Sequence, residues 1–185
     1  MFIQTEPTPN PASMKFLPGR AVMEDGVADF PDADTAEDAS PLARRLFTVD
    51  GVAGVYLGRD FITVSKDERI DWHSLKPAVL GAIMEHFMSG EPVVVEAALP
   101  DEAGHDPADD EVVKQIRELI DTRVRPAVAQ DGGDIVFHGF ERGVVYLHMR
   151  GACSGCPSSV VTLKNGIENL LRYYVPEVAE VRAIG

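Results

Sequence analysis

The first half of the chain alternates short apolar runs with polar or glycine-containing breaks, a pattern typical of β-strands. Apolar runs at residues 2–3 and 14–17 flank a proline-rich segment, so we predict two short strands joined by a stiff loop. Further runs at residues 52–57 and 61–65 are interrupted only at residues 58–60. This spacing predicts a β-hairpin.

Helical signals lie between and after these runs. Ser40 and Pro41 supply an N-cap and a first-turn proline for a short helix. Asp71 is placed to cap a longer helix that ends at Gly90. The apolar positions of that helix recur at helical spacing: Leu75, Val79, Ile83 and Phe87. Residues 93–95 predict a last strand, so the first half predicts a small α+β module.

The second half begins with a helical pattern that gives way to strands. Apolar residues recur at helical spacing from residue 112 to residue 124, and we expect Pro126 to end or kink this helix. Strand-like runs at residues 135–140 and 144–149 are joined by a turn at residues 141–143. Apolar and polar side chains alternate along the second run, which indicates an antiparallel strand buried on one face.

Residues 98–110, between the two halves, have no apolar period and carry several acids, so they indicate a linker. We therefore predict an α+β fold of two small α+β domains, residues 1–97 and 109–185, joined by an acidic flexible linker at residues 98–108. The second domain is expected to contain a helix, a β-hairpin, a turn with a CxxC motif, a helix and a short strand. Each domain has under about 100 residues, within the range that folds alone.

The charge of the chain restricts its partners. The 185 residues are 45% hydrophobic, which is ordinary for a globular protein, and the formal net charge is −13. Both halves are acidic, and no basic cluster is longer than Arg44 and Arg45. Such a surface repels nucleic acid phosphates and anionic membranes, so we expect neither as a partner.

The sequence also bears on location. No run approaches the ~18 apolar residues of a membrane span, and the first residues lack the order of a signal peptide. They also include Glu6 and almost no arginine, unlike a transit peptide. We expect a cytoplasmic bacterial protein or, as the alternative, the mature form of a mitochondrial matrix protein.

The chain has 2 cysteines, Cys153 and Cys156, within the sequence Gly-Ala-Cys-Ser-Gly-Cys-Pro at residues 151–157. In a reducing compartment such a pair is more often metal-binding or redox-active than a structural disulfide. A helical apolar period follows at residues 160–174, so the pair lies in the turn that leads into a helix. If Pro157 is the first helical residue, Cys156 is the N-cap, where backbone N–H groups and the helix dipole favour the metal-binding thiolate.

The number of thiols predicts a second copy. Gly151 and Gly155 leave the approach to both sulfurs free of side chains and let backbone N–H groups turn toward an anionic cluster. A cubane iron–sulfur cluster or a zinc ion takes about four protein ligands, more than one chain supplies. A second copy related by a two-fold axis would present the same pair at the interface. A cluster held there can leave by ligand exchange with an acceptor's cysteines, which suits transfer.

Residue chemistry alone leaves three alternatives open. In the first, the cysteines are incidental reduced thiols, and in the second, the same sulfurs bind zinc. In the third, the chain is a thiol–disulfide oxidoreductase, because such enzymes also use a CxxC pair at a helix start. Against the oxidoreductase, the preceding strands resemble a hairpin rather than part of a βαβ unit, and only one helix and one short run follow.

Other candidate residues are weaker. His138 and His148 lie on strands outside the turn, so we expect surface or satisfied residues rather than ligands. Asp131 and Asp134 flank a Gly-Gly pair and are expected to form a turn and a cap rather than an acid–base pair. Three large side chains of the first domain are expected to pack in the core or at its rim rather than form a cofactor site: Trp72, Met84 and Met88.

Three segments of the second domain together resemble a known family. Gln-Asp-Gly-Gly-Asp at residues 130–134, the cysteine motif extended to residues 151–159, and Leu-Lys-Asn-Gly-Ile-Glu at residues 163–168 closely resemble the C-terminal domain of NifU, the Nfu domain. Phe-Ile-Gln-Thr-Glu-Pro-Thr-Pro-Asn-Pro at residues 2–11, with Met-Lys-Phe at residues 14–16, resembles the N-terminal domain of bacterial and mitochondrial Nfu proteins. The two resemblances cover nearly the whole chain except the linker.

The resemblance implies a scaffold or carrier for iron–sulfur clusters rather than an enzyme. It implies a 4Fe-4S cluster bound through Cys153 and Cys156 and shared between two subunits, so that the holo form is a homodimer. The implied partners are upstream cluster assembly proteins and apo-proteins that receive the cluster, such as enzymes that make or use lipoate. For the N-terminal domain, the resemblance implies recognition of acceptors or donors.

Overall fold

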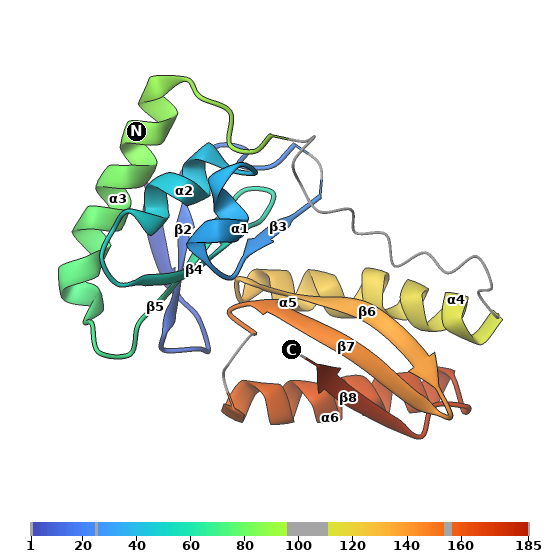
Figure 1. Ribbon diagram of the computed structural model, residues 1–185. Coiled ribbons are helices and arrows are strands. Elements are labelled where there is room, and N and C mark those ends of the chain that lie inside the picture. Colours follow the sequence, from blue (N-terminus) through green and yellow to red (C-terminus); the bar gives the residue numbers. More distant parts are fainter. Residues whose placement is uncertain (1, 25, 96–110, 154–156, 185) are drawn as a thin grey trace. The chain divides into compact units, whose positions relative to one another are not determined.

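The chain divides into two compact units, Met1–Asp101 and Glu102–Gly185, and each combines helices with strands (Figure 1). The predicted α+β fold with two domains is therefore confirmed. The predicted linker at residues 98–108 lies outside the described residues, so its bounds stay a prediction. The structure, a computed structural model, describes residues 2–24, 26–95, 111–153 and 157–184, except for the side chains of residues 157–160.

The N-terminal unit is built on an antiparallel sheet with the strand order β1-β2-β5-β4-β3. Its strands are β1 (Gln4–Pro7), β2 (Ser13–Leu17), β3 (Ala28–Phe30), β4 (Val52–Leu57) and β5 (Ile62–Lys66). Its helices are α1 (Ala33–Glu37), α2 (Pro41–Phe47) and α3 (Trp72–Ser89). Sheet and helices share one core, whose fully buried side chains include Phe16, Phe30, Leu42, Leu46, Leu57, Ile62 and Ile83.

The hairpin and the helix ends of this unit form as predicted. β4 and β5 pair as an antiparallel hairpin, and the Gly58 N–H donates to the Phe61 carbonyl across the turn at 2.9 Å. The Ser40 hydroxyl caps α2 by accepting a hydrogen bond from the Ala43 N–H at 3.0 Å. α3 ends at Gly90, whose φ of 76° lies in the left-handed region that glycine adopts without strain.

Other expectations for this unit are wrong or incomplete. β1 begins at Gln4, beyond the apolar run that predicted it. Residues 93–95 form no strand, because this segment bonds instead to the residues before α2, where the Val95 N–H donates to the Ala39 carbonyl at 2.8 Å. β3 and α1 were not predicted, since elements this short show no period that a sequence pattern can reveal.

The C-terminal unit contains a three-stranded sheet ordered β6-β7-β8. In chain order its elements are α4 (Glu111–Leu119), the π-helical turn η2 (Ile120–Val124), α5 (Arg125–Gln130), β6 (Gly133–Glu141), β7 (Val144–Gly151), α6 (Pro157–Tyr174) and β8 (Glu180–Ile184). The core between helices and sheet includes Ile116, Ile120, Ile135, Leu147 and Leu171. Within the described part of the chain, no helix has both the length and the apolar character needed to cross a membrane.

The helical segment before β6, made of α4, η2 and α5, contains Pro126. Pro126 was expected to end or kink it, and the structure shows a wide turn followed by a further helix. In η2 the N–H of Arg125 donates to the carbonyl of Ile120, the i→i−5 bond of a π-turn. Pro126 then occupies the first turn of α5, where its missing N–H is tolerated.

α6 connects two strands that are parallel neighbours in the sheet. β6 and β7 form the predicted antiparallel hairpin, and the turn residues Arg142 and Gly143 have φ of 52° and 79°, as a type I′ turn requires. β8 pairs with β7 in parallel, so β7, α6 and β8 form a β-α-β unit. The argument that the cysteine motif is not part of such a unit was therefore wrong, and it no longer counts against thiol–disulfide exchange.

Candidate functional site

Cys153 lies directly after β7, where the chain turns toward α6. Gly151 has φ of 61°, a left-handed conformation that L side chains rarely adopt. The Ala152 N–H then donates to the Gly132 carbonyl at 3.2 Å, which ties the start of the motif to the segment before β6. Cys153 is 7% exposed and packs with the core of the unit.

The second candidate ligand, Cys156, lies outside the described residues. The described part of α6 starts at Pro157, directly after the residues that are not described. Whether Cys156 caps the helix, and how near it lies to Cys153, therefore stay predictions.

Gly133 forms a support under the Cys153 sulfur. A β-carbon added at Gly133 would lie 2.4 Å from the Cys153 Sγ atom and 3.0 Å from the Cys153 backbone nitrogen. The first separation is shorter than real atoms allow and the second is tighter than most real contacts, so the thiol occupies space that a β-carbon at Gly133 would need. The sequence marked the Gly-Gly pair as a turn, but Gly133 is a strand residue paired with Gly151.

Asp134 has a role that the sequence did not reveal. It was expected to form a turn or cap, but it is 4% exposed and accepts two hydrogen bonds from Arg125. The Nε–Oδ1 distance is 2.9 Å and the second N–O distance, to Oδ2, is 2.8 Å. These bonds raise the pKa of the Arg125 guanidinium above its usual range. Asp131, by contrast, is the C-cap of α5, as a turn residue would be.

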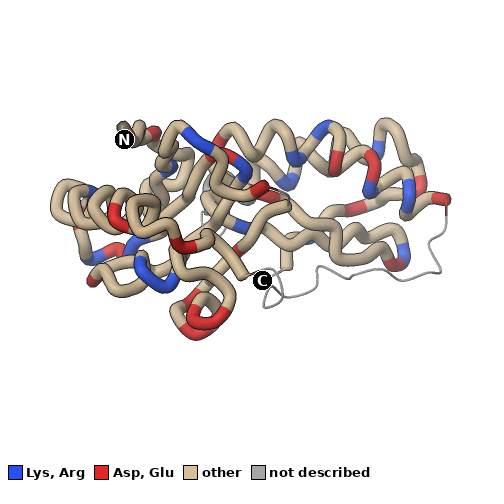
Figure 2. Tube along the Cα trace, turned by 90° about the horizontal axis from the view of Figure 1, so that it is seen from above, with Lys and Arg blue, Asp and Glu red and all other residues tan. Residues whose placement is uncertain are grey.

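The remaining candidates of the C-terminal unit do not add ligands. His138 is exposed and His148 is half-buried on the sheet. Across the residues that the structure describes, no group of three or more His, Cys, Asp or Glu side chains is arranged to hold a metal ion. Acidic and basic residues are interleaved along the helices of this unit rather than gathered by sign (Figure 2).

The N-terminal unit offers packing residues in place of a cofactor site. Trp72 lies at the rim of the core, as expected, with its ring 6.3 Å from that of Phe16 and its Nε1–H donating to the Pro11 carbonyl at 3.0 Å. The expectation is wrong for Met88, which is 79% exposed, whereas Met84 is 38% exposed and lies at the margin.

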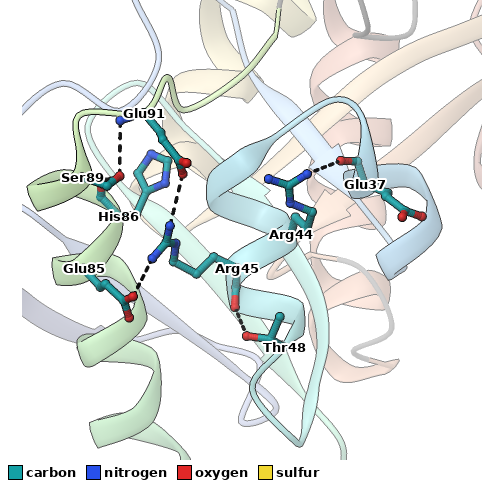
Figure 3. A network of polar contacts seen from close by, with 8 residues as sticks. All are labelled: Glu37, Arg44, Arg45, Thr48, Glu85, His86, Ser89 and Glu91. Atoms are coloured by element: carbon teal, nitrogen blue, oxygen red, sulfur yellow. Dashed lines mark hydrogen bonds and ion pairs between the residues drawn. The ribbon is translucent and has the colours of Figure 1, made fainter.

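A buried histidine in the N-terminal unit was also missed (Figure 3). Arg45 of α2 pairs with Glu85 of α3 at 2.9 Å and with Glu91 at 3.1 Å. Beside them His86 is 0% exposed, and neither ring nitrogen has a hydrogen-bond partner among the described residues. Burial lowers the pKa of His86, Arg45 lowers it further, and Glu91 acts in the opposite direction. The ring is therefore neutral near pH 7.

Family comparisons agree with the two units. A model described as "Scaffold protein Nfu/NifU N terminal" matches residues 3–90, and one described as "NifU-like domain" matches residues 116–182. The human protein named "NFU1 iron-sulfur cluster scaffold homolog, mitochondrial" is 52% identical over all 185 residues, which span 72% of its length. The chain belongs to the Nfu family. The predicted resemblance is thereby confirmed.

A second curated relative is about as similar as the human protein, whereas the solved structures are more distant. The protein of the same name from Drosophila sechellia is 54% identical over the whole chain, which spans 65% of the length of that relative. An NMR structure of a NifU-like protein from Saccharomyces cerevisiae is 28% identical, with a TM-score of 0.42, over 52% of this chain and 86% of that chain. A crystal structure of a Staphylococcus aureus protein is 24% identical, with a TM-score of 0.39, over 44% of this chain and 98% of that chain.

Proposed function

We propose that this Nfu-family chain is an iron–sulfur cluster carrier. It holds a 4Fe-4S cluster between two copies of itself, through Cys153 and Cys156 of each copy, and transfers the cluster to apo-proteins. The cluster is cargo, and the chain carries out no reaction of its own. The observation that carries the proposal is the setting of Cys153, between a glycine support and the start of a helix.

The surroundings of Cys153 fit a thiolate that binds a cluster. Thiolate is a soft ligand of the kind that iron–sulfur clusters take. The buried position of Cys153 among apolar side chains limits water access, and water access is one of the factors that set cluster stability and potential. The N-terminus of α6 supplies N–H groups and a partial positive charge near the motif, which favour an anionic cluster.

Stoichiometry supports a shared cluster. The chain contains 2 cysteines, and the described residues provide no larger ligand group. A cubane cluster takes about four protein ligands, which a pair of chains provides. At a boundary between copies, an acceptor's thiolates can replace the ligands one after another, which supports delivery to apo-proteins from a donor upstream.

Names of relatives bear on location and clients only by analogy. The human and Drosophila sechellia relatives are called mitochondrial, which favours the mitochondrial alternative over the bacterial cytoplasm. We propose that location for this chain, and the bacterial cytoplasm stays a prediction. Enzymes that make or use lipoate stay the proposed clients.

Anaerobic reconstitution with iron and sulfide tests the proposal. We expect a brown dimer with about four iron atoms per pair of chains, and a largely monomeric apo form. Cys153→Ser and Cys156→Ser should each abolish both the colour and the dimer, because either change halves the sulfur ligands. His138→Ala, which removes an exposed imidazole of the same unit, is the matched control and should behave as wild type.

Each rival gives a different result. A zinc protein would be a colourless dimer that retains zinc after purification. A thiol–disulfide oxidoreductase would be a monomer in which the two serine variants differ, because only the attacking thiol forms a mixed disulfide. A monomer with a full cluster, or a Cys153→Ser protein that still dimerises around one, would refute the shared site.

A further inference from the structure

We infer that Arg125 is a positioning residue for Cys153 and acts through Asp134 and the start of β6. The inference rests on the proposed function, since it assigns Arg125 to the support of a cluster ligand. In this inference Arg125 acts on the sulfur indirectly. It fixes the strand against which the sulfur lies.

The first link is the ion pair between Arg125 and Asp134. Two hydrogen bonds of 2.9 and 2.8 Å join the planar guanidinium to both carboxylate oxygens, a geometry that fixes orientation as well as distance. The Asp134 side chain is 5% exposed. Its Oδ1 also accepts a hydrogen bond from the Ile135 N–H at 2.9 Å, so the carboxylate holds the strand backbone as well.

The second link runs from Asp134 to the sulfur through its chain neighbour. Gly133 precedes Asp134 and is the residue against which the Cys153 Sγ packs. Gly133 also pairs with Gly151, and the Ala152 N–H donates to the Gly132 carbonyl at 3.2 Å. A shift of Asp134 would therefore move both the support under the sulfur and the partner of the backbone that leads to Cys153.

The π-turn explains why Arg125 reaches Asp134. Four core residues recur at a spacing of four along this helix: Ile116, Ile120, Val124 and Val128. In a regular α-helix each such step drifts about 40° around the axis, so the last residue would leave the core face. The wide turn η2 takes up this drift and so fixes where Arg125, the next residue, lies. Arg125 also pairs with Asp121 at 3.4 Å.

Stability alone is a poor explanation for this pair. The Asp134 side chain is 5% exposed and the Arg125 side chain 30% exposed, so the pair lies partly out of water. Desolvation offsets much of the attraction in such a pair, and well-packed apolar residues can often replace it. An apolar pair should therefore preserve the fold. It would not reproduce the two directed hydrogen bonds that hold the start of β6.

The test replaces the pair in the full chain by apolar residues, Arg125→Met with Asp134→Leu. The first readout is the alkylation rate of Cys153 by iodoacetamide in the apo protein, in a Cys156→Ser background where Cys153 is the only thiol. The second, with both cysteines present, is retention of the reconstituted cluster against a chelator. Far-UV circular dichroism in urea reports whether fold and stability are kept. The matched control is Arg182→Met with Glu180→Leu, which removes an exposed pair from β8 of the same unit.

We expect the variant with the apolar pair to keep its fold. Its Cys153 should be alkylated faster than in the Cys156→Ser protein with the native pair. With both cysteines present, cluster affinity should fall by about 10- to 100-fold, as removal of supporting contacts around metal ligands typically does. The control should match wild type in both readouts. If the apolar pair does not fold, Arg125→Lys takes its place, because lysine keeps the charge without the paired geometry.

The inference is wrong if a folded variant alkylates at the wild-type rate, or if the rate rises only as far as the loss of global stability explains. Failure of the proposed function is separate. If wild type binds no cluster, the alkylation readout still decides whether Arg125 positions Cys153.

Discussion

Gly133→Ala is the change that most directly tests the support under Cys153. The added β-carbon would lie 2.4 Å from Sγ and 3.2 Å from Cβ of Cys153. Carbon and sulfur in contact need at least about 3.5 Å, so the sulfur must retreat by about 1 Å. Metal–sulfur distances vary by only about 0.2 Å, so this displacement is large for a ligand.

The cost to folding should be smaller than the cost to binding. Overpacking in a core destabilises by about 1–3 kcal/mol. Restriction of the unfolded chain by alanine offsets about 0.4–1 kcal/mol of this, because no left-handed φ stands against alanine at Gly133. The variant should therefore fold with a stability loss of roughly 0–2.5 kcal/mol.

The assay is anaerobic reconstitution, with iron counting and the visible spectrum, beside a urea titration followed by circular dichroism. The control is Gly139→Ala on the same strand, where an added β-carbon meets no atom within 4 Å. We expect Gly133→Ala to fold but to bind little iron, and Gly139→Ala to bind as wild type. Wild-type iron content and an unchanged spectrum in Gly133→Ala would refute the argument that the sulfur needs this support.

Two further predictions concern the N-terminal unit, which contains the single tryptophan, Trp72, so that its fluorescence reports unfolding of this unit. Because burial holds the pKa of His86 below the ordinary 6.5, the unfolded state takes up a proton first as pH falls. The N-terminal unit should therefore lose stability as pH falls below about 6.5, by at most about 1.4 kcal/mol per pH unit and only until the folded state is protonated as well. His86→Leu should remove this component of the pH dependence, and His73→Gln, at an exposed histidine, should retain it. Gly81→Ala should stabilise α3 by up to about 1 kcal/mol, because the added β-carbon meets no atom. Gly90→Ala, at a φ of 76°, should destabilise it by about 1–2 kcal/mol. Equal changes in the free energy of unfolding of the two variants, measured by urea titration, would contradict this.

Local signals predicted much of the fold correctly. Helix caps and hairpin turns depend on a few adjacent residues, so Ser40, Gly90 and the turn at residues 141–143 could be read from the sequence. The parallel pairing of β8 with β7 could not, because it joins segments separated by a whole helix. Residues 93–95 failed for the same reason, since their apolar character suits a strand but their partners lie near the start of α2.

The candidate site shows the same limit. The spacing of Cys153 and Cys156 was enough to propose both as cluster ligands, because a CxxC motif is local. The supports of Cys153 are not local: Gly133 lies on another strand and Arg125 on a helix before it. A Gly-Gly-Asp sequence favours a turn, and only the fold shows that its second glycine makes room for a sulfur while the aspartate is buried against an arginine.

In the proposed dimer the cluster is bound in two ways. Each copy holds its own Cys153 in a fixed position, whereas the two copies can separate from each other. Gly133, Asp134 and Arg125 all belong to the C-terminal unit, so each copy fixes Cys153 by its own contacts. Half of the proposed ligands come from the other copy, and the pairing of copies depends on their concentration and on the cluster itself. A client that offers competing thiolates therefore need not unfold either half-site, because it only has to replace the contribution of one copy. A site enclosed by a single chain would lack this route, and for that reason the arrangement suits a carrier better than a protein that keeps its cluster.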